Sequence, residues 1–174
     1  MLTITTYIEK KTIDTFGNMQ DSFIALNDSL STQVANRQLK RHKGHKLDGV
    51  VVITTTDTMM TNFIDWDDID FMWMGILEMT LQYKKIGFGV HAMAMNNHER
   101  SIKRIITKPA NLILFTVKRN PGTFLCNETN NIVLEEEFLS EILNAANEFI
   151  SFRQKLLNVG NVEGLKKLMS EIQL

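Results

Sequence analysis

The spacing of apolar residues divides the chain into segments with the period of a strand or of a helix. The first segment, Leu2 to Ile8, is rich in β-branched residues and predicts an opening strand. A 3.6-residue period follows and predicts a helix whose apolar stripe is Phe16, Met19, Phe23, Leu26 and Leu30. The basic stretch 36–46 lacks this period and predicts a loop, which is also a candidate flexible segment.

The middle of the chain carries the clearest signals. From Leu47 a continuous apolar run predicts a strand over 48–56 that is buried on both faces. A helix is predicted over 66–84, with Asp65 as its N-cap and Gly87 just beyond its end. The buried side of this helix is expected to include Trp73, Ile76 and Leu77.

After Gly87 the period changes to that of strands. Short runs separated by turns predict an antiparallel meander with strands at 88–95, 101–107, 111–118 and 123–126. Two helices are predicted to close the chain, at 135–157 and 162–172. We therefore expect one α+β domain over 1–174, an antiparallel β-sheet covered by helices, two of them C-terminal.

Composition narrows the function classes. The 174 residues include 19 basic and 20 acidic side chains and a single cysteine, so neither a disulfide framework nor a strong overall charge is present. The opening MLTITTYIEKK lacks the pattern of a secretory signal, and the apolar run Phe71–Leu77 is too short to span a membrane. These features predict a cytoplasmic protein with no membrane association.

An acidic cluster marks the entrance of the 66–84 helix: Asp65, Asp67, Asp68 and Asp70. A calcium loop would need an oxygen ligand where Ile69 stands and a glycine after it, so we expect no metal site. The carboxylates favour the helix dipole. If they are exposed beside an indole, they also suit protein recognition, and the predicted binding residues are Trp66, Asp67, Asp68 and Asp70.

Other candidate chemistry is weaker. His91, His98 and Glu99 are the histidine–carboxylate group of the meander and support an alternative function as a small enzyme or ligand-binding protein. The cations of segment 37–46 support a second alternative, nucleic-acid association, although no aromatic residue interleaves for base stacking: Arg37, Lys40, Arg41, Lys43 and Lys46. Cys126 is expected to be a buried apolar residue. No complete catalytic constellation or cofactor motif is found, and no cofactor is expected.

One family resemblance concerns the order of the elements. The helix segment FIDWDDIDFMWMGILEMTLQYK, the meander and the helix segment LSEILNAANEFISF together resemble small bacterial immunity proteins of polymorphic toxin systems, over residues 47–155. The resemblance implies a non-enzymatic protein that occludes a toxin, and it transfers no functional residue. The leading prediction is thus a protein-binding module, an immunity or inhibitor protein whose partner is a protein.

Overall fold

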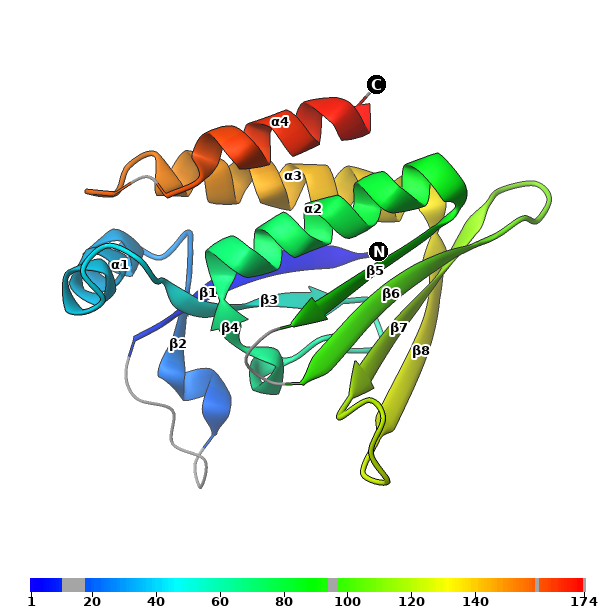
Figure 1. The fold of residues 1–174 in the computed structure, drawn as a ribbon, viewed down its shortest axis with the longest axis horizontal. Coiled ribbons are helices and arrows are strands. Elements are labelled where there is room, and N and C mark those ends of the chain that lie inside the picture. The colour runs from blue at the N-terminus through cyan, green and yellow to red at the C-terminus, as the bar shows by residue number, and fades with distance from the viewer. Residues whose placement is uncertain (11–17, 94–96, 159, 174) are drawn as a thin grey trace.

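The computed structural model describes residues 1–10, 18–93, 97–158 and 160–173. Within these ranges the strands form two four-stranded antiparallel sheets (Figure 1). The first sheet has the order β2-β1-β3-β4. Its strands are β1 (Thr3–Glu9), β2 (Phe23–Ala25), β3 (Asp48–Thr54) and β4 (Asp67–Asp68). The second sheet follows chain order and consists of β5 (Phe88–Met93), β6 (His98–Ile105), β7 (Leu112–Arg119) and β8 (Asn127–Leu134).

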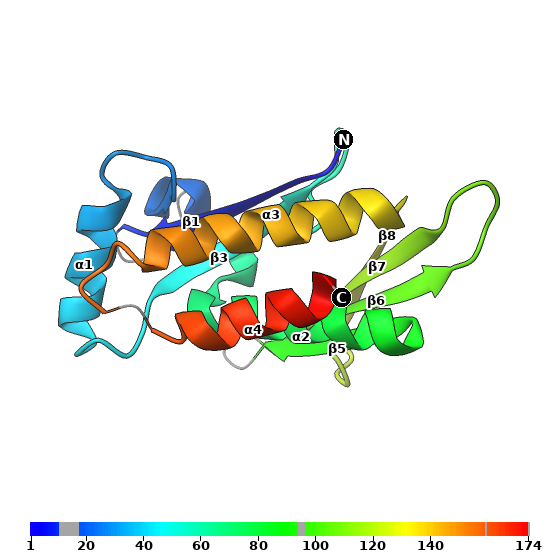
Figure 2. The same cartoon turned by 90° about the horizontal axis from the view of Figure 1, so that it is seen from above.

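Helices connect and cover these sheets. They are α1 (Ser31–Arg41), α2 (Ile69–Ile86), α3 (Glu135–Arg153) and α4 (Val162–Gln173), with short 3-10 turns η1 (Met19–Ser22) and η2 (Phe63–Asp65). Figures 1 and 2 show α2, α3 and α4 together on one side of the sheets. The α+β class with two C-terminal helices is therefore confirmed. The predicted single sheet is wrong, because α2 leaves the edge strand β4 of one sheet and leads into the edge strand β5 of the other.

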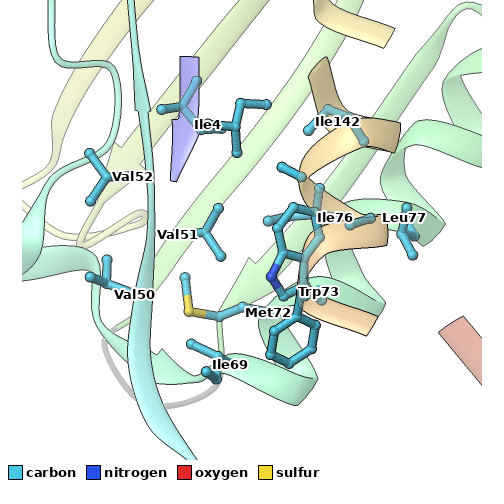
Figure 3. Close-up of a cluster of buried hydrophobic side chains, with 14 of the residues drawn as sticks. Ile4, Val50, Val51, Val52, Ile69, Met72, Trp73, Ile76, Leu77 and Ile142 are labelled. Carbon is cyan, nitrogen blue, oxygen red and sulfur yellow. The ribbon is translucent and has the colours of Figure 1, made fainter. Parts of the chain in front are cut away.

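One hydrophobic core holds the helices and both sheets together. Figure 3 shows Trp73 of α2 between Val51 of β3 and Ile142 of α3. Trp73, Ile76 and Leu77 are all 0% exposed, which confirms the predicted buried face of this helix. Residues 48–53 are buried without interruption, as the continuous apolar run of β3 predicts.

Helix α2 ends as predicted and begins later than predicted. Gly87 takes the left-handed conformation at φ 75°, and its N–H donates to the carbonyl of Tyr83. The N-cap is Asp68, whose Oδ1 accepts from the N–H of Asp70 at 3.0 Å. The prediction of Asp65 as N-cap is wrong, because Asp65 completes a capping box with Asn62 at η2.

The predicted helix at 16–30 is wrong, and so is part of the predicted loop. Residues 23–25 form β2, in which Phe23 is buried opposite Glu9 of β1, so cross-strand pairing overrides the apparent helical period. Phe16 lies outside the described residues. Of the segment 36–46, residues 36–41 belong to α1. Gln38 anchors this helix, because its side chain bonds the carbonyl of Glu9 and both backbone groups of Asp48.

The meander is confirmed with shifted boundaries. Turns occupy 120–125, so the predicted strand over 123–126 is wrong, and β8 instead pairs with β7 over its whole length. Helix α3 stops at Arg153 rather than at residue 157. None of the helices in the described ranges has the length and apolarity needed to cross a bilayer.

Candidate functional site

The acidic cluster is buried rather than exposed. Asp65, Asp67 and Asp68 have relative exposures of 0%, 3% and 6%, so the expectation of exposed carboxylates at 67 and 68 is wrong. The cause is local pairing, because Asp67 and Asp68 form β4 and lie opposite Gly49 and Asp48 of β3. A short strand at the helix entrance was not visible in the periodicity of the sequence.

The carboxylates of this cluster bind groups of the same chain. Asp65 accepts two hydrogen bonds from Arg119, at 2.9 and 2.7 Å, in the bidentate geometry that favours arginine. Asp70 binds Arg153 in the same way, with Nε at 2.9 Å and Nη2 at 2.7 Å. Asp67 accepts from the N–H of Asp68 at 2.7 Å. These bonds give the cluster a structural role at the start of α2.

Burial also changes the acidity of this cluster. The pKa of Asp68 is raised to about 6, first by desolvation and then by the neighbouring charge of Asp70. Trp66 is half-buried and packs against the core. The role of Trp66, Asp67, Asp68 and Asp70 in protein recognition stays a prediction, which now depends chiefly on Trp66.

The histidines and the carboxylate of the enzyme alternative lie on opposite faces of the second sheet. His91 faces α2, because its ring fills the space beside Gly75. His98 is buried on the same side, and its Nδ1 lies 3.0 Å from Oδ1 of Asp65. Glu99 follows His98 along β6 and therefore points to the other face, where it lies 3.9 Å from Lys118. The structure does not bring His91, His98 and Glu99 together.

Arg100 is a buried charge that the sequence did not reveal as such. It is 0% exposed, and within the described part of the chain none of its guanidinium nitrogens has a hydrogen-bond partner. Desolvation lowers its pKa to about 10, while the carboxylates of Asp65 and Asp67 act in the opposite direction. The guanidinium therefore stays charged at neutral pH. The available signal was the alternation of β6, which places Arg100 on the same face as buried Ile102.

The half-buried histidine His91 makes stability depend on pH. Its pKa is lowered from 6.5 to about 4, mainly by desolvation and secondly by the charge of Arg100. The folded chain therefore binds fewer protons at this site than the unfolded chain, and stability is lost as pH falls from 6.5 towards 4. We expect the wild type to lose up to roughly 3 kcal/mol more than His91→Asn between neutral pH and about pH 4.

Wild type and His91→Asn are compared at each pH because Asp68 changes the stability with pH in the opposite direction to His91. Its raised pKa makes the folded chain bind more protons between pH 6 and 3.8, and this contribution is common to both proteins. Urea unfolding followed by circular dichroism measures the difference. His45→Asn, at an exposed position, is the control and should keep the wild-type pH profile. Parallel profiles for wild type and His91→Asn would show that His91 titrates normally.

The basic segment is partly neutralised by carboxylates. Lys46 lies 2.7 Å from Asp48, and Arg41 lies 3.7 Å from both Glu9 and Asp48. Lys40 and Lys43 are exposed. Pairing with these carboxylates leaves less charge for phosphate than the count of cations indicates. The second alternative, nucleic-acid association, gains no support from this geometry.

The turn between β7 and β8 is apolar and exposed. Phe124 is 96% exposed, and Leu125 is 64% exposed. Cys126 is exposed as well, so its prediction as a buried residue is wrong, because β8 begins only after it. Hydrogen bonds from Thr123 Oγ1 to the carbonyl of Asn120 and from the N–H of Cys126 to the carbonyl of Thr123 fix the turn.

The second sheet has one covered and one open face. We call the open side of β5–β8 the outer face. Figures 1 and 2 show the helices α2, α3 and α4 on the other side of this sheet. The burial patterns agree, since β5 exposes Phe88, Val90 and Ala92 while Gly89 and Met93, at alternate positions, are buried. In β8 the exposed residues 128, 130, 132 and 134 define the same face.

Cross-strand partners form rows across the outer face. These rows change from apolar at one end of the strands to charged at the other end. One row pairs Phe88, Lys103, Leu114 and Ile132 on successive strands. The next row is polar and pairs Val90, Ser101, Thr116 and Asn130. The last row ends with Glu99, Lys118 and Glu128, in which the lysine lies within 4.0 Å of both carboxylates. The outer face is thus apolar at the end nearest the β6–β7 turn.

The apolar end of the outer face exposes large side chains. Phe88 is 42% exposed, Ile132 is 61% exposed and Leu134 is 48% exposed. Single exposed apolar residues are ordinary, but several of them on one sheet face are typical of a surface that another molecule covers. The apolar run 132–134 at the end of β8 has residues on both faces of the sheet, so the sequence could not tell which of them the helices cover.

Neither metal-binding groups nor similarity to known proteins assigns a function to this chain. Within the described ranges, histidine, cysteine, aspartate and glutamate side chains form no group of three or more that could hold a metal ion. Comparison with protein-family models, curated proteins and solved structures finds no match for this chain. The candidate functional site therefore rests on the geometry of the outer face.

Proposed function

We propose that this chain is a non-enzymatic protein-binding module and that its outer face is the surface that binds the partner protein. The observation that carries the proposal is the exposure of Phe88 at one edge and of Ile132 and Leu134 at the other edge of one uncovered sheet face, with Lys103 and Leu114 between them. Burying these side chains against a partner removes apolar area from water, which is the main driving force of protein association. Aromatic side chains such as that of Phe88 are enriched in protein interfaces.

The polar rows of the outer face support the same proposal. Interfaces combine an apolar centre with a polar rim. Beside the apolar end, Thr116 bonds Asn130 across the strands at 2.6 Å, and the charged row lies beyond. Occlusion of a partner by a flat sheet face fits an inhibitor or immunity protein, and the family resemblance of the element order points in that direction. The partner is then a protein such as a toxin.

Site-specific photo-cross-linking tests this proposal. A photoreactive amino acid placed at position 132, in the full chain expressed in its native host, should cross-link to a defined partner protein. The matched control is position 157, because Leu157 is 75% exposed and lies by α1, at the opposite end of the molecule in Figure 2. We expect a cross-linked partner at 132 and none at 157, identified by mass spectrometry.

Three outcomes would contradict the proposed function. Cross-links at position 157 with the same partner and the same yield would show that the outer face has no special role. Absence of any cross-link at 132, in a protein with the thermal stability of the wild type, would show that the face stays open to solvent in the cell. Formation of a dimer of this chain through position 132 would assign the face to self-association instead.

A further inference from the structure

An open hollow adjoins the apolar end of the outer face. It has a volume of about 530 Å³ and lies between the end of α2, the start of β5 and the end of β6. Its lining is Ile86, Gly87, Phe88, Lys103, Arg104 and Ile106. Ile86 is 69% exposed and Ile106 is 82% exposed, so both apolar side chains remain available at the rim.

The backbone around the hollow is well fixed. Gly87 turns the chain in the left-handed conformation and so sets Ile86 and Phe88 on either side of it. The N–H of Arg104 donates to the carbonyl of Gly87 at 2.9 Å, which ties β6 to this turn. The Arg104 guanidinium lies 4.8 Å above the ring of Tyr83 and binds Glu135 at 3.1 Å. A fixed hollow loses little conformational entropy when it binds a ligand.

The charge at the hollow is positive. Lys103 and Arg104 line it, and no carboxylate does. Lys103 is exposed and forms no ion pair within the described residues. Lys85 precedes the rim residue Ile86 but lines a separate hollow, together with Glu78 and Val90. Since Arg104 already binds Glu135, the charge available to a ligand comes chiefly from Lys103.

We infer that this hollow binds an acidic segment of the partner protein, in which a bulky apolar side chain is flanked by carboxylates. The apolar side chain would lie against Phe88, Ile86 and Ile106, and the carboxylates would face Lys103. This inference rests on the proposed function, because the hollow is continuous with the outer face at Phe88. The inference adds the chemical character of the partner segment that the hollow binds.

A protein segment fits the surroundings better than an anionic membrane does. The same outer face carries Glu99 and Glu128 in its charged row, and a flat membrane lying on this face would bring these carboxylates towards anionic headgroups. Vesicle binding is therefore an outcome that counts against the inference.

A random peptide library displayed on phage, selected on the immobilised full chain, tests the inference without knowledge of the natural partner. Enriched peptides should share a bulky apolar residue with neighbouring carboxylates. A synthetic peptide of the enriched sequence, measured by fluorescence anisotropy, should bind Phe88→Ser and Lys103→Glu about tenfold more weakly or worse than the wild type. Replacing the peptide's carboxylates by amides should weaken its binding to the wild type similarly.

Two substitutions at exposed positions of the same chain serve as controls. Leu157→Ser and Lys40→Glu change an exposed apolar residue and an exposed cation away from the hollow, and they should leave peptide affinity unchanged. Enriched peptides without carboxylates, the absence of enriched peptides, or affinity that ignores Phe88 and Lys103 would overturn the inference. Binding to phosphatidylserine vesicles that depends on Phe88 would overturn it as well. The cross-link at position 132 distinguishes this failure from a failure of the proposed function.

Discussion

Trp73→Ala is expected to lower the free energy of unfolding by about 3–5 kcal/mol. The indole is 0% exposed and stacks on the ring of Phe149, with 6.0 Å between centroids. Its Nε1 donates to Thr6 Oγ1 at 3.1 Å, so the substitution also leaves a buried hydroxyl without this partner. Urea unfolding followed by far-ultraviolet circular dichroism measures the loss.

Two variants make this expectation specific. Trp73→Phe keeps an aromatic ring against Phe149 and should lose less stability than alanine. Trp66→Ala removes an indole that is half-buried, so it should also cost less. If Trp73→Ala unfolds at the urea concentration of the wild type, the packing of α2 between β3 and α3 is refuted.

Asp70→Ala is expected to cost about 3–5 kcal/mol, because it leaves a buried charge uncompensated. Arg153 is 1% exposed and gives two hydrogen bonds to Asp70, while its remaining Nη1 binds the carbonyl of Asn158 at 2.7 Å. The pair joins the first turn of α2 to the last turn of α3. The same unfolding measurement reports the loss.

The double variant Asp70→Leu with Arg153→Met tests the electrostatic origin of that loss. It removes both charges and fills the site with apolar groups, so it should recover most of the stability lost in Asp70→Ala. The exposed pair of Glu163 and Lys166 is the control, and Glu163→Ala should change stability by less than about 0.5 kcal/mol. Equal effects of Asp70→Ala and Glu163→Ala would show that Arg153 reaches water.

Local patterns in the sequence predicted the elements whose burial follows a single period. The stripe of α2 and the continuous run of β3 define the core, and Gly87 marks the helix end. The failure at 16–30 has a physical cause, because the residues of β2 satisfy their backbone bonds by pairing with β1. Pairing between distant segments leaves no mark in a local period.

The candidate site was harder to predict, because it depends on partners that are distant in the sequence. Asp65 and Arg119 are separated by 54 residues, and Asp70 and Arg153 by 83. Nothing near the acidic cluster shows that arginines bury it, so its charges suggested an exposed surface. The outer face has the converse problem, since Ile132 and Leu134 of β8 become part of a surface only when the helices cover the opposite side of the sheet.

The affinity of the cross-linked partner for surface variants tests the central claim most directly. Isothermal titration calorimetry measures Kd for three variants. The outer-face double variant combines Phe88→Ser and Ile132→Ser, and the helix-entrance double variant combines Trp66→Ala and Asp68→Asn. Leu157→Ser is the control. We expect the outer-face double variant to raise Kd by about 100-fold, with a change of less than about threefold in the control. An unchanged Kd for the outer-face variant, with binding lost in the Trp66 and Asp68 variant, would contradict the claim and assign recognition to the helix entrance.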